Sequence, residues 1–214
     1  MIRRADAAVF LTLAATTMLV VVARSSDAVA VPGVVSGAAR GGPAAAYAEG
    51  APPGFSGGFN EQSCHACHFH GEVNSGPERV ALAGVPTRYV AGDAYRLTVT
   101  LRRPDMKLAG FQLTARYKDD GTQAGTLTVA SGDDARVKVE TQGDVQYVNQ
   151  RKEGTALTEA HTARWSVLWT APDAPDASRP VVFHVAANAG DGDGTAEGDY
   201  VETATVEAIP AGAE

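Results

Sequence analysis

Residues 164–170 read RWSVLWT, and this stretch decides the fold class. Every second residue in it is apolar, so that Trp165, Val167 and Trp169 fall on one face of an extended chain. Because side chains alternate between the two faces of a strand, a period of two predicts a half-buried antiparallel strand. Two indoles on the same face are large enough to anchor a core between two layers.

Seven further ranges repeat this alternation, and turn-forming Gly, Asp and Pro residues separate them. The ranges are 95–101 (YRLTVTL), 111–117 (FQLTARY), 126–129, 137–141, 145–148, 181–187 (VVFHVAA) and 200–208 (YVETATVEA). About eight strands without a long helical pattern indicate an all-β chain, folded as an antiparallel sandwich or barrel. We expect Tyr95, Phe111 and Phe183 to pack with the two tryptophans between the layers.

The N-terminal residues have the three parts of a secretory signal peptide. Arg3 and Arg4 give a basic start, residues 7–22 form an apolar run, and the AVA sequence at 28–30 is a small-residue cleavage site. The alternative is a membrane anchor, but the run is shorter than the ~20 residues that a spanning helix needs. We therefore predict Sec-type export from a bacterial cell, removal of residues 1–30, and a periplasmic or secreted protein without stable membrane insertion after cleavage.

The remaining chain divides into four parts by composition. Residues 31–54 are rich in Ala, Gly and Pro and lack periodicity, which predicts a flexible arm. Residues 55–86 form a loop segment with both cysteines, residues 87–209 carry the sandwich, and residues 210–214 are a short tail. The tail has no apolar anchor and no sorting sequence, so we expect a soluble protein.

The chain is acidic, with a formal net charge of −7 over 214 residues. A protein that binds nucleic acid carries a basic patch for the phosphates, so this composition argues against that class. Charge steering favours partners with basic surfaces instead. The only cysteines are Cys64 and Cys67, and one bridge across two intervening residues would stabilise very little.

Residues 64–68 read CHACH, the C-x-x-C-H pattern by which c-type haem is attached. Two cysteines three positions apart on one tight turn can reach the two vinyl groups of a porphyrin, and the next histidine projects its imidazole under the iron. Covalent attachment also removes the need for a deep pocket. We therefore predict one covalent haem c, bound through Cys64 and Cys67, with His68 as the proximal ligand of the iron.

Two other interpretations of the cysteine pair are open. A redox-active dithiol needs a thioredoxin-like βαβ context, and the sequence around the motif has no such pattern. A zinc or other metal site would combine the cysteines with nearby histidines in place of a second cysteine pair. The histidines within reach are His65, His68 and His70.

The second axial ligand of the iron has two main candidates. His161 precedes the tryptophan strand, and Met106 is the only methionine outside the predicted signal peptide. We expect His161 first and Met106 second, with an open or water-filled position as the third option. A methionine ligand would raise the reduction potential relative to a second histidine. His184 lies within a predicted strand and is expected to be half-exposed, while His65 and His70 start on the proximal side.

Residues 188–199 read NAGDGDGTAEGD and alternate glycines with acids. Carboxylates at short spacing are oxygen ligands of the kind that Ca²⁺ prefers. The spacing does not match an EF-hand loop, and a Gly/Asp turn between two strands has the same composition. A turn is the simpler prediction, and a calcium loop stays open.

Residues 55–208 resemble the bacterial choice-of-anchor V domain, which is itself similar to the Reeler domain. The resemblance is carried by the glycine-rich lead into CHACH, YRLTV at 95–99, GFQLTA at 110–115, HT at 161–162, Trp165, WTAP at 169–172, NAGDG at 188–192 and GD at 198–199. It implies an immunoglobulin-like, Reeler-like antiparallel β-sandwich preceded by a haem-binding C-x-x-C-H segment. The HT pair belongs to this pattern and favours His161 as a haem contact. The Reeler domain has a similar pair without haem, so a structural role for His161 stays open.

A haem held in this way predicts an electron-transfer protein rather than an enzyme. The iron would alternate between its ferric and ferrous states, and redox partner proteins would dock transiently at a small interface. A second hypothesis is an extracytoplasmic binding or adhesion module whose motif holds a structural metal or haem. A third is a haem-based sensor of small ligands, which needs an open axial position on the iron.

Overall fold

The computed structural model describes residues 47–76, 79–173 and 178–212. The predicted signal peptide, residues 1–30, and residues 31–46 of the predicted arm lie outside this part of the chain. Within the described residues, no helix is both long and apolar enough to cross a bilayer. These residues contain every predicted strand of the sandwich and the cysteine motif itself.

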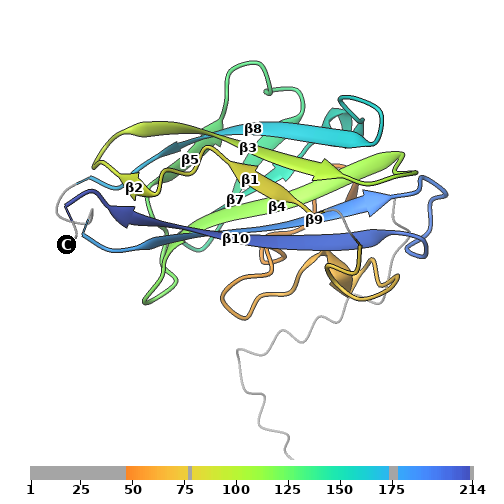
Figure 1. Cartoon of the computed structure of the whole chain (residues 1–214), viewed down its shortest axis with the longest axis horizontal. Coiled ribbons are helices and arrows are strands. Elements are labelled where there is room, and N and C mark those ends of the chain that lie inside the picture. The colour runs from red at the N-terminus through yellow and green to blue at the C-terminus, as the bar shows by residue number, and fades with distance from the viewer. Residues whose placement is uncertain (1–46, 77–78, 174–177, 213–214) are drawn as a thin grey trace, which may run out of the picture. The chain divides into compact units, whose positions relative to one another are not determined.

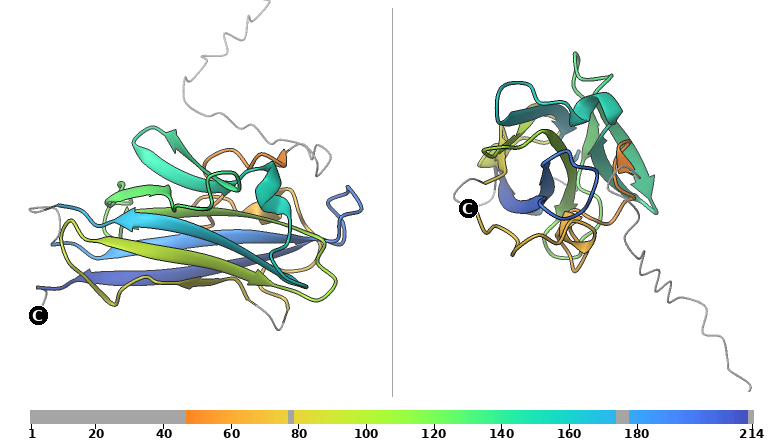
Figure 2. Two further views of the ribbon diagram at one scale, coloured as in Figure 1. Left: turned by 90° about the horizontal axis from the view of Figure 1, so that it is seen from above. Right: turned by 90° about the vertical axis from the view of Figure 1, so that its right-hand side faces the viewer.

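The strands form two sheets that pack face to face (Figures 1 and 2). The four-stranded sheet has the order β1 (Ala81–Ala83), β3 (Ala94–Arg102), β8 (Thr162–Thr170) and β5 (Thr126–Val129). The six-stranded sheet has the order β2 (Arg88–Tyr89), β10 (Tyr200–Pro210), β9 (Val181–Gly190), β4 (Leu108–Tyr117), β7 (Val145–Gln150) and β6 (Val137–Gln142). All strand pairs are antiparallel except β2 with β10. The predicted antiparallel β-sandwich is confirmed.

Two observed strands, β1 and β2, are not among the predicted ones. They have three and two residues, which is too short to show a period of two. β1 pairs with β3 in the smaller sheet, and β2 pairs with the end of β10 in the larger sheet. These short strands connect the motif segment to both sheets of the sandwich.

The core between the sheets is aromatic, as the alternation predicts. Trp165 and Trp169 of β8 are fully buried. Trp165 stacks on Phe111 of the opposite sheet at 4.5 Å between ring centroids, and Trp169 meets Phe183 edge-on at 4.9 Å. Each indole Nε1 donates to a backbone carbonyl, at 2.8 Å for Trp165 and 2.9 Å for Trp169, so their polar atoms are also satisfied.

The outer face of the six-stranded sheet is buried as well, which the alternation does not predict. Gln112, Thr114 and Arg116 of β4 point away from the core, yet they are only 0%, 0% and 6% exposed. Residues 47–76, which we call the cover, lie over this face and run in orange to yellow below β9 and β10 in Figure 1. The cysteine motif therefore packs on the outer face of the six-stranded sheet, which the alternation predicts to be exposed to solvent.

Candidate functional site

A buried network of polar side chains binds the cover to the six-stranded sheet. Glu61 accepts a hydrogen bond from Arg116 and another from the Tyr147 hydroxyl at 2.5 Å, while Ser56 donates to its second oxygen at 2.7 Å. Arg116 also donates to Tyr147. Burial and the neighbouring Glu61 carboxylate raise the pKa of Tyr147, so the phenol stays protonated and donates. Charge-assisted bonds of this kind fix the direction of the segment as well as its position.

A second set of contacts holds the start of the cover. The side-chain amide of Gln112 donates to the Pro52 carbonyl at 2.8 Å and accepts from the Phe55 amide. It also donates to Asn149 at 3.0 Å. The backbone amide of Phe55 and the carbonyl of Pro52 therefore pair with the Gln112 side chain rather than with a neighbouring strand.

The cysteine motif forms one tight turn. Residues Cys64–Ala66 are a 3-10 turn, η2, whose N-cap Ser63 accepts a hydrogen bond from the His65 amide at 3.3 Å. The amides of Cys67 and His68 both donate to the carbonyl of Cys64, at 3.1 and 3.0 Å. One turn thus carries both thiols and the imidazole of His68.

Both thiols are free and partly exposed. Burial raises the pKa of the Cys64 thiol to about 12. A redox-active dithiol or a zinc thiolate depends on a lowered thiol pKa, which stabilises the deprotonated sulfur. Burial of Cys64 thus opposes deprotonation of its sulfur.

His68 is oriented by a carboxylate from the other end of the chain. Its Nδ1 lies 2.6 Å from Oδ2 of Asp199, and the two side chains are 18% and 5% exposed. A carboxylate only accepts hydrogen bonds, so Nδ1 carries the proton and donates it. In the neutral ring the lone pair is then on Nε2, which is the tautomer that a metal ligand needs.

Asp199 is itself held in place at the start of β10. Its Oδ1 accepts from the backbone amide of Asp191 at 3.1 Å. The side-chain nitrogen Nδ2 of Asn188 donates to Asp199 Oδ2 at 3.3 Å and lies 3.2 Å from His68 Nδ1. Neither Asp199 nor Asn188 is a site residue predicted from the sequence, although both stand in motifs of the resemblance, NAGDG and GD.

The rest of the acidic loop behaves as a turn. Asp193 accepts from the amide of Thr195 at 2.7 Å, and Asp191 accepts from the amide of Asp193 at 3.0 Å. These are the local side-chain to backbone bonds by which Asp residues close turns. Across the described residues, no three His, Cys, Asp or Glu side chains come together as a metal-binding group. The loop's visible role is to present Asp199.

The histidines that flank His68 have different surroundings. His70 packs edge-on against Tyr200, with ring centroids 4.9 Å apart. Nδ1 of His65 is buried and makes no hydrogen bond within the described residues. The turn therefore directs only His68 toward a partner that fixes its tautomer.

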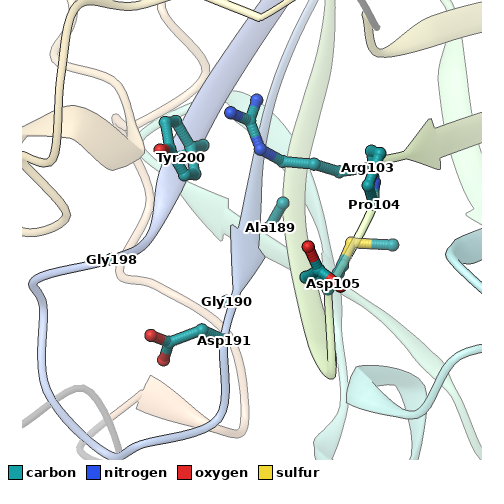
Figure 3. Close-up of a pocket in the computed structure, with 9 residues that line it drawn as sticks. Arg103, Pro104, Asp105, Ala189, Gly190, Asp191, Gly198 and Tyr200 are labelled. Atoms are coloured by element: carbon teal, nitrogen blue, oxygen red, sulfur yellow. The ribbon is translucent and has the colours of Figure 1, made fainter.

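Met106 lies on the other side of the six-stranded sheet from His68. It is buried in the core and lines a cavity of about 260 Å³ with Ala189 and Tyr200, beside Arg103 (Figure 3). Ala189 faces the core, whereas its neighbour Asn188 faces His68 on the outside. No hydrogen bond or ring contact among the described residues joins Met106 to His68, and Met106 stays a prediction as an axial ligand.

His161 is exposed in the turn before β8. Its backbone has a φ of 60°, in the left-handed region, and its carbonyl accepts from the amide of Arg103 at 3.1 Å. No hydrogen bond, ion pair or ring contact within the described residues joins it to the cysteine turn. As an axial ligand, His161 stays a prediction.

His184 is packed beneath the cover and is half-buried. Phe59 meets its ring edge-on at 5.2 Å, and Thr205 lies 3.1 Å from its Nδ1. A Cβ at Gly58 would lie 2.2 Å from the ring, so only glycine allows the cover to pass this close. Burial and the nearby Arg116 lower the pKa of His184, which keeps it neutral.

No family model and no curated protein matches the chain. Among solved structures, it is similar to the human F-spondin reeler domain at 19% identity and a TM-score of 0.42, covering 63% of this chain and 88% of that one. It is similar to a cohesin module from Clostridium perfringens at 13% and 0.41, covering 62% and 96%. It is also similar to the Actinomyces fimbrial adhesin FimA at 20% and 0.34, covering 64% and 50%.

Proposed function

We propose that the chain carries one haem c and transfers single electrons outside the cytoplasm. Cys64 and Cys67 would hold the porphyrin covalently, and His68 would be the proximal ligand of the iron. The observation that carries this proposal is the 2.6 Å contact between His68 Nδ1 and Asp199, because it leaves Nε2 as the free nitrogen.

The donor set fits a haem. Two free thiols and an imidazole with one committed nitrogen occupy a single turn on the outside of the sheet. Each thiol can add across a vinyl group, its sulfur bonding to one carbon and its hydrogen passing to the next, so no oxidant is needed. Covalent attachment would also do without a deep pocket around the porphyrin.

The bound group would supply a one-electron ferric/ferrous couple. With haem bound, this couple would let the protein receive one electron from a reduced redox partner and release it to an oxidised one. The chain's own contribution is to hold the imidazole, fix its tautomer and limit water around Asp199. His161 and Met106 stay predictions for the second axial ligand.

Intact mass after expression with haem-attachment machinery tests this proposal. We expect a mass gain of roughly 600 Da that survives denaturation, together with a pyridine haemochrome spectrum of thioether-linked haem. A variant with Cys64→Ala and Cys67→Ala is the control and should show neither. Exported wild-type protein that is colourless and has only its polypeptide mass would contradict the proposal.

The second candidate is an extracytoplasmic binding or adhesion module. It is favoured by the Glu61, Arg116 and Tyr147 network, which holds the cover to the sheet through polypeptide contacts alone. Haem-free protein from the same preparation, with the thermal midpoint of the doubly substituted control, would favour this candidate over the first.

A further inference from the structure

We propose that Asp199 is a positioning residue that lowers the reduction potential of the iron by holding the proximal His68 with a full negative charge. This inference rests on the proposed haem site. It concerns a residue outside the C-x-x-C-H motif, separated from His68 by 131 positions in the sequence.

The contact has the properties of a strong, charge-assisted hydrogen bond. The two heavy atoms are 2.6 Å apart, and the Asp199 side chain is only 5% exposed. A hydrogen bond to an ionised acceptor is roughly twice as strong as a neutral one, and low exposure reduces its screening by water. Among the described residues, Asp199 forms an ion pair with His68 and with no Lys or Arg. Its charge therefore acts on the imidazole without a competing cation.

The carboxylate draws the Nδ1 proton toward itself and so increases electron density on Nε2. A more basic Nε2 stabilises the ferric ion more than the ferrous ion, because the ferric ion carries the larger positive charge. The equilibrium then shifts toward ferric iron, and the potential falls. A neutral acceptor at the same position would orient the ring without this electronic effect.

The loop is built so that Asp199 cannot turn away. Its Oδ1 accepts from the Asp191 amide while Oδ2 faces His68, so both carboxylate oxygens are engaged. Gly198 has a φ of 83°, and a Cβ there would lie 2.4 Å from an Asp191 carboxylate oxygen. Only glycine allows the chain to close this tightly before Asp199.

The test compares Asp199→Asn with Asp193→Asn in haem-loaded protein. Asparagine keeps the shape and an acceptor oxygen in both variants, but Asp193 is exposed in the same loop and does not contact His68. We expect Asp199→Asn to shift the ferric/ferrous equilibrium about tenfold toward ferrous iron, which is 59 mV for a one-electron couple. Asp193→Asn should shift the reduction potential by less than a third of that amount. The potential of Asp199→Glu should lie between those of wild type and Asp199→Asn.

A second measurement uses the protein before haem is attached. The imidazole ¹⁵N spectrum of His68 should show the Nδ1–H tautomer in wild type and a mixture of tautomers in Asp199→Ala. Asp193→Ala should leave the wild-type spectrum unchanged. This readout reports the contact itself, even if Asp199→Asn accumulates poorly with haem.

The outcomes separate the two proposals. Haem-loaded Asp199→Asn with the potential of Asp193→Asn would overturn the role of Asp199 while leaving the haem site intact. An imidazole ¹⁵N spectrum of Asp199→Ala identical to that of wild type would also overturn the role of Asp199 and leave the haem site intact. Wild-type protein that never acquires haem would overturn both proposals, and the intact mass identifies that case directly.

Discussion

The inner face of the six-stranded sheet and the part of its outer face beneath the cover are both buried, but against different chemistry. The inner face of β4 presents Phe111, Leu113 and Ala115 to the tryptophan core, whereas the outer face presents Gln112 and Arg116 to the cover. Apolar contacts stabilise in proportion to area and have little directionality. Hydrogen bonds between buried polar groups demand a specific partner in a specific place. The inner face thus holds the fold together, and the outer face decides where the cysteine turn lies.

The largest expected effect is on the inner face. Trp165→Ala removes a fully buried indole that stacks on Phe111, and we expect the free energy of unfolding to fall by about 3–5 kcal/mol. Urea denaturation followed by circular dichroism measures this loss. Leu108→Ala, at an exposed apolar side chain of β4, is the control and should change it by less than about 0.5 kcal/mol. A loss below about 1.5 kcal/mol for Trp165→Ala would mean that the core is not the main source of stability.

The next effect is on the outer face and should be local. Glu61→Ala leaves the buried Arg116 and Tyr147 without their acceptor, at a cost of about 2 kcal/mol. We expect faster amide hydrogen exchange throughout residues 47–76, with strands of the four-stranded sheet unchanged. Glu72→Ala, an exposed carboxylate of the same cover, should exchange like wild type. Uniform acceleration in both sheets would show that cover and core unfold as one unit.

A smaller effect depends on pH through His184. Its pKa is lowered in the folded protein by burial and by Arg116, from an ordinary value of 6.5. The folded state then binds fewer protons than the unfolded state, so this contribution is complete above about pH 6.5 and is lost as pH falls toward the lowered pKa. We expect the cover of wild type to loosen between pH 7 and pH 5.5, measured by hydrogen exchange. His184→Gln should show a weaker pH dependence, and an identical one would exclude His184 as the cause.

The smallest effect is expected where the outer face is not covered. Lys118 and Glu207 form an exposed pair at 2.7 Å, and such pairs contribute about 0–1 kcal/mol. Glu207→Gln should therefore change the free energy of unfolding by less than about 0.5 kcal/mol in urea. A change as large as that of Glu61→Ala would mean that burial is not what distinguishes the two polar sites.

The same difference between the faces explains what could be predicted from sequence. The inner face follows from alternation, because apolar side chains at every second position have no other stable place. The polar positions between them, such as Gln112 and Arg116, are typical of a solvent-exposed face. Their burial depends on residues of the cover that lie far away in sequence, and no local period reports such a contact.

The candidate site divides in a similar way. Cys64, Cys67 and His68 are recognisable because their chemistry requires a fixed short spacing on one turn. The sequence places Asp199 in a Gly/Asp turn or a calcium loop and does not predict its contact with His68, which spans 131 positions and leaves no pattern in either segment. Met106 is recognisable from sequence as a ligand type, but its burial in the core depends on contacts that no local pattern reports.

The order of the elements along the chain has a consequence for how the protein matures. Ribosomes make the cover before β10 and the loop that presents Asp199. Until that strand joins the sheet, His68 lacks the Asp199 carboxylate that orients its ring, although Glu61 can already bind Arg116 and Tyr147. Closure of the last strand ends this period by locking the imidazole in place, so late folding and early synthesis together define an interval for chemistry on the turn.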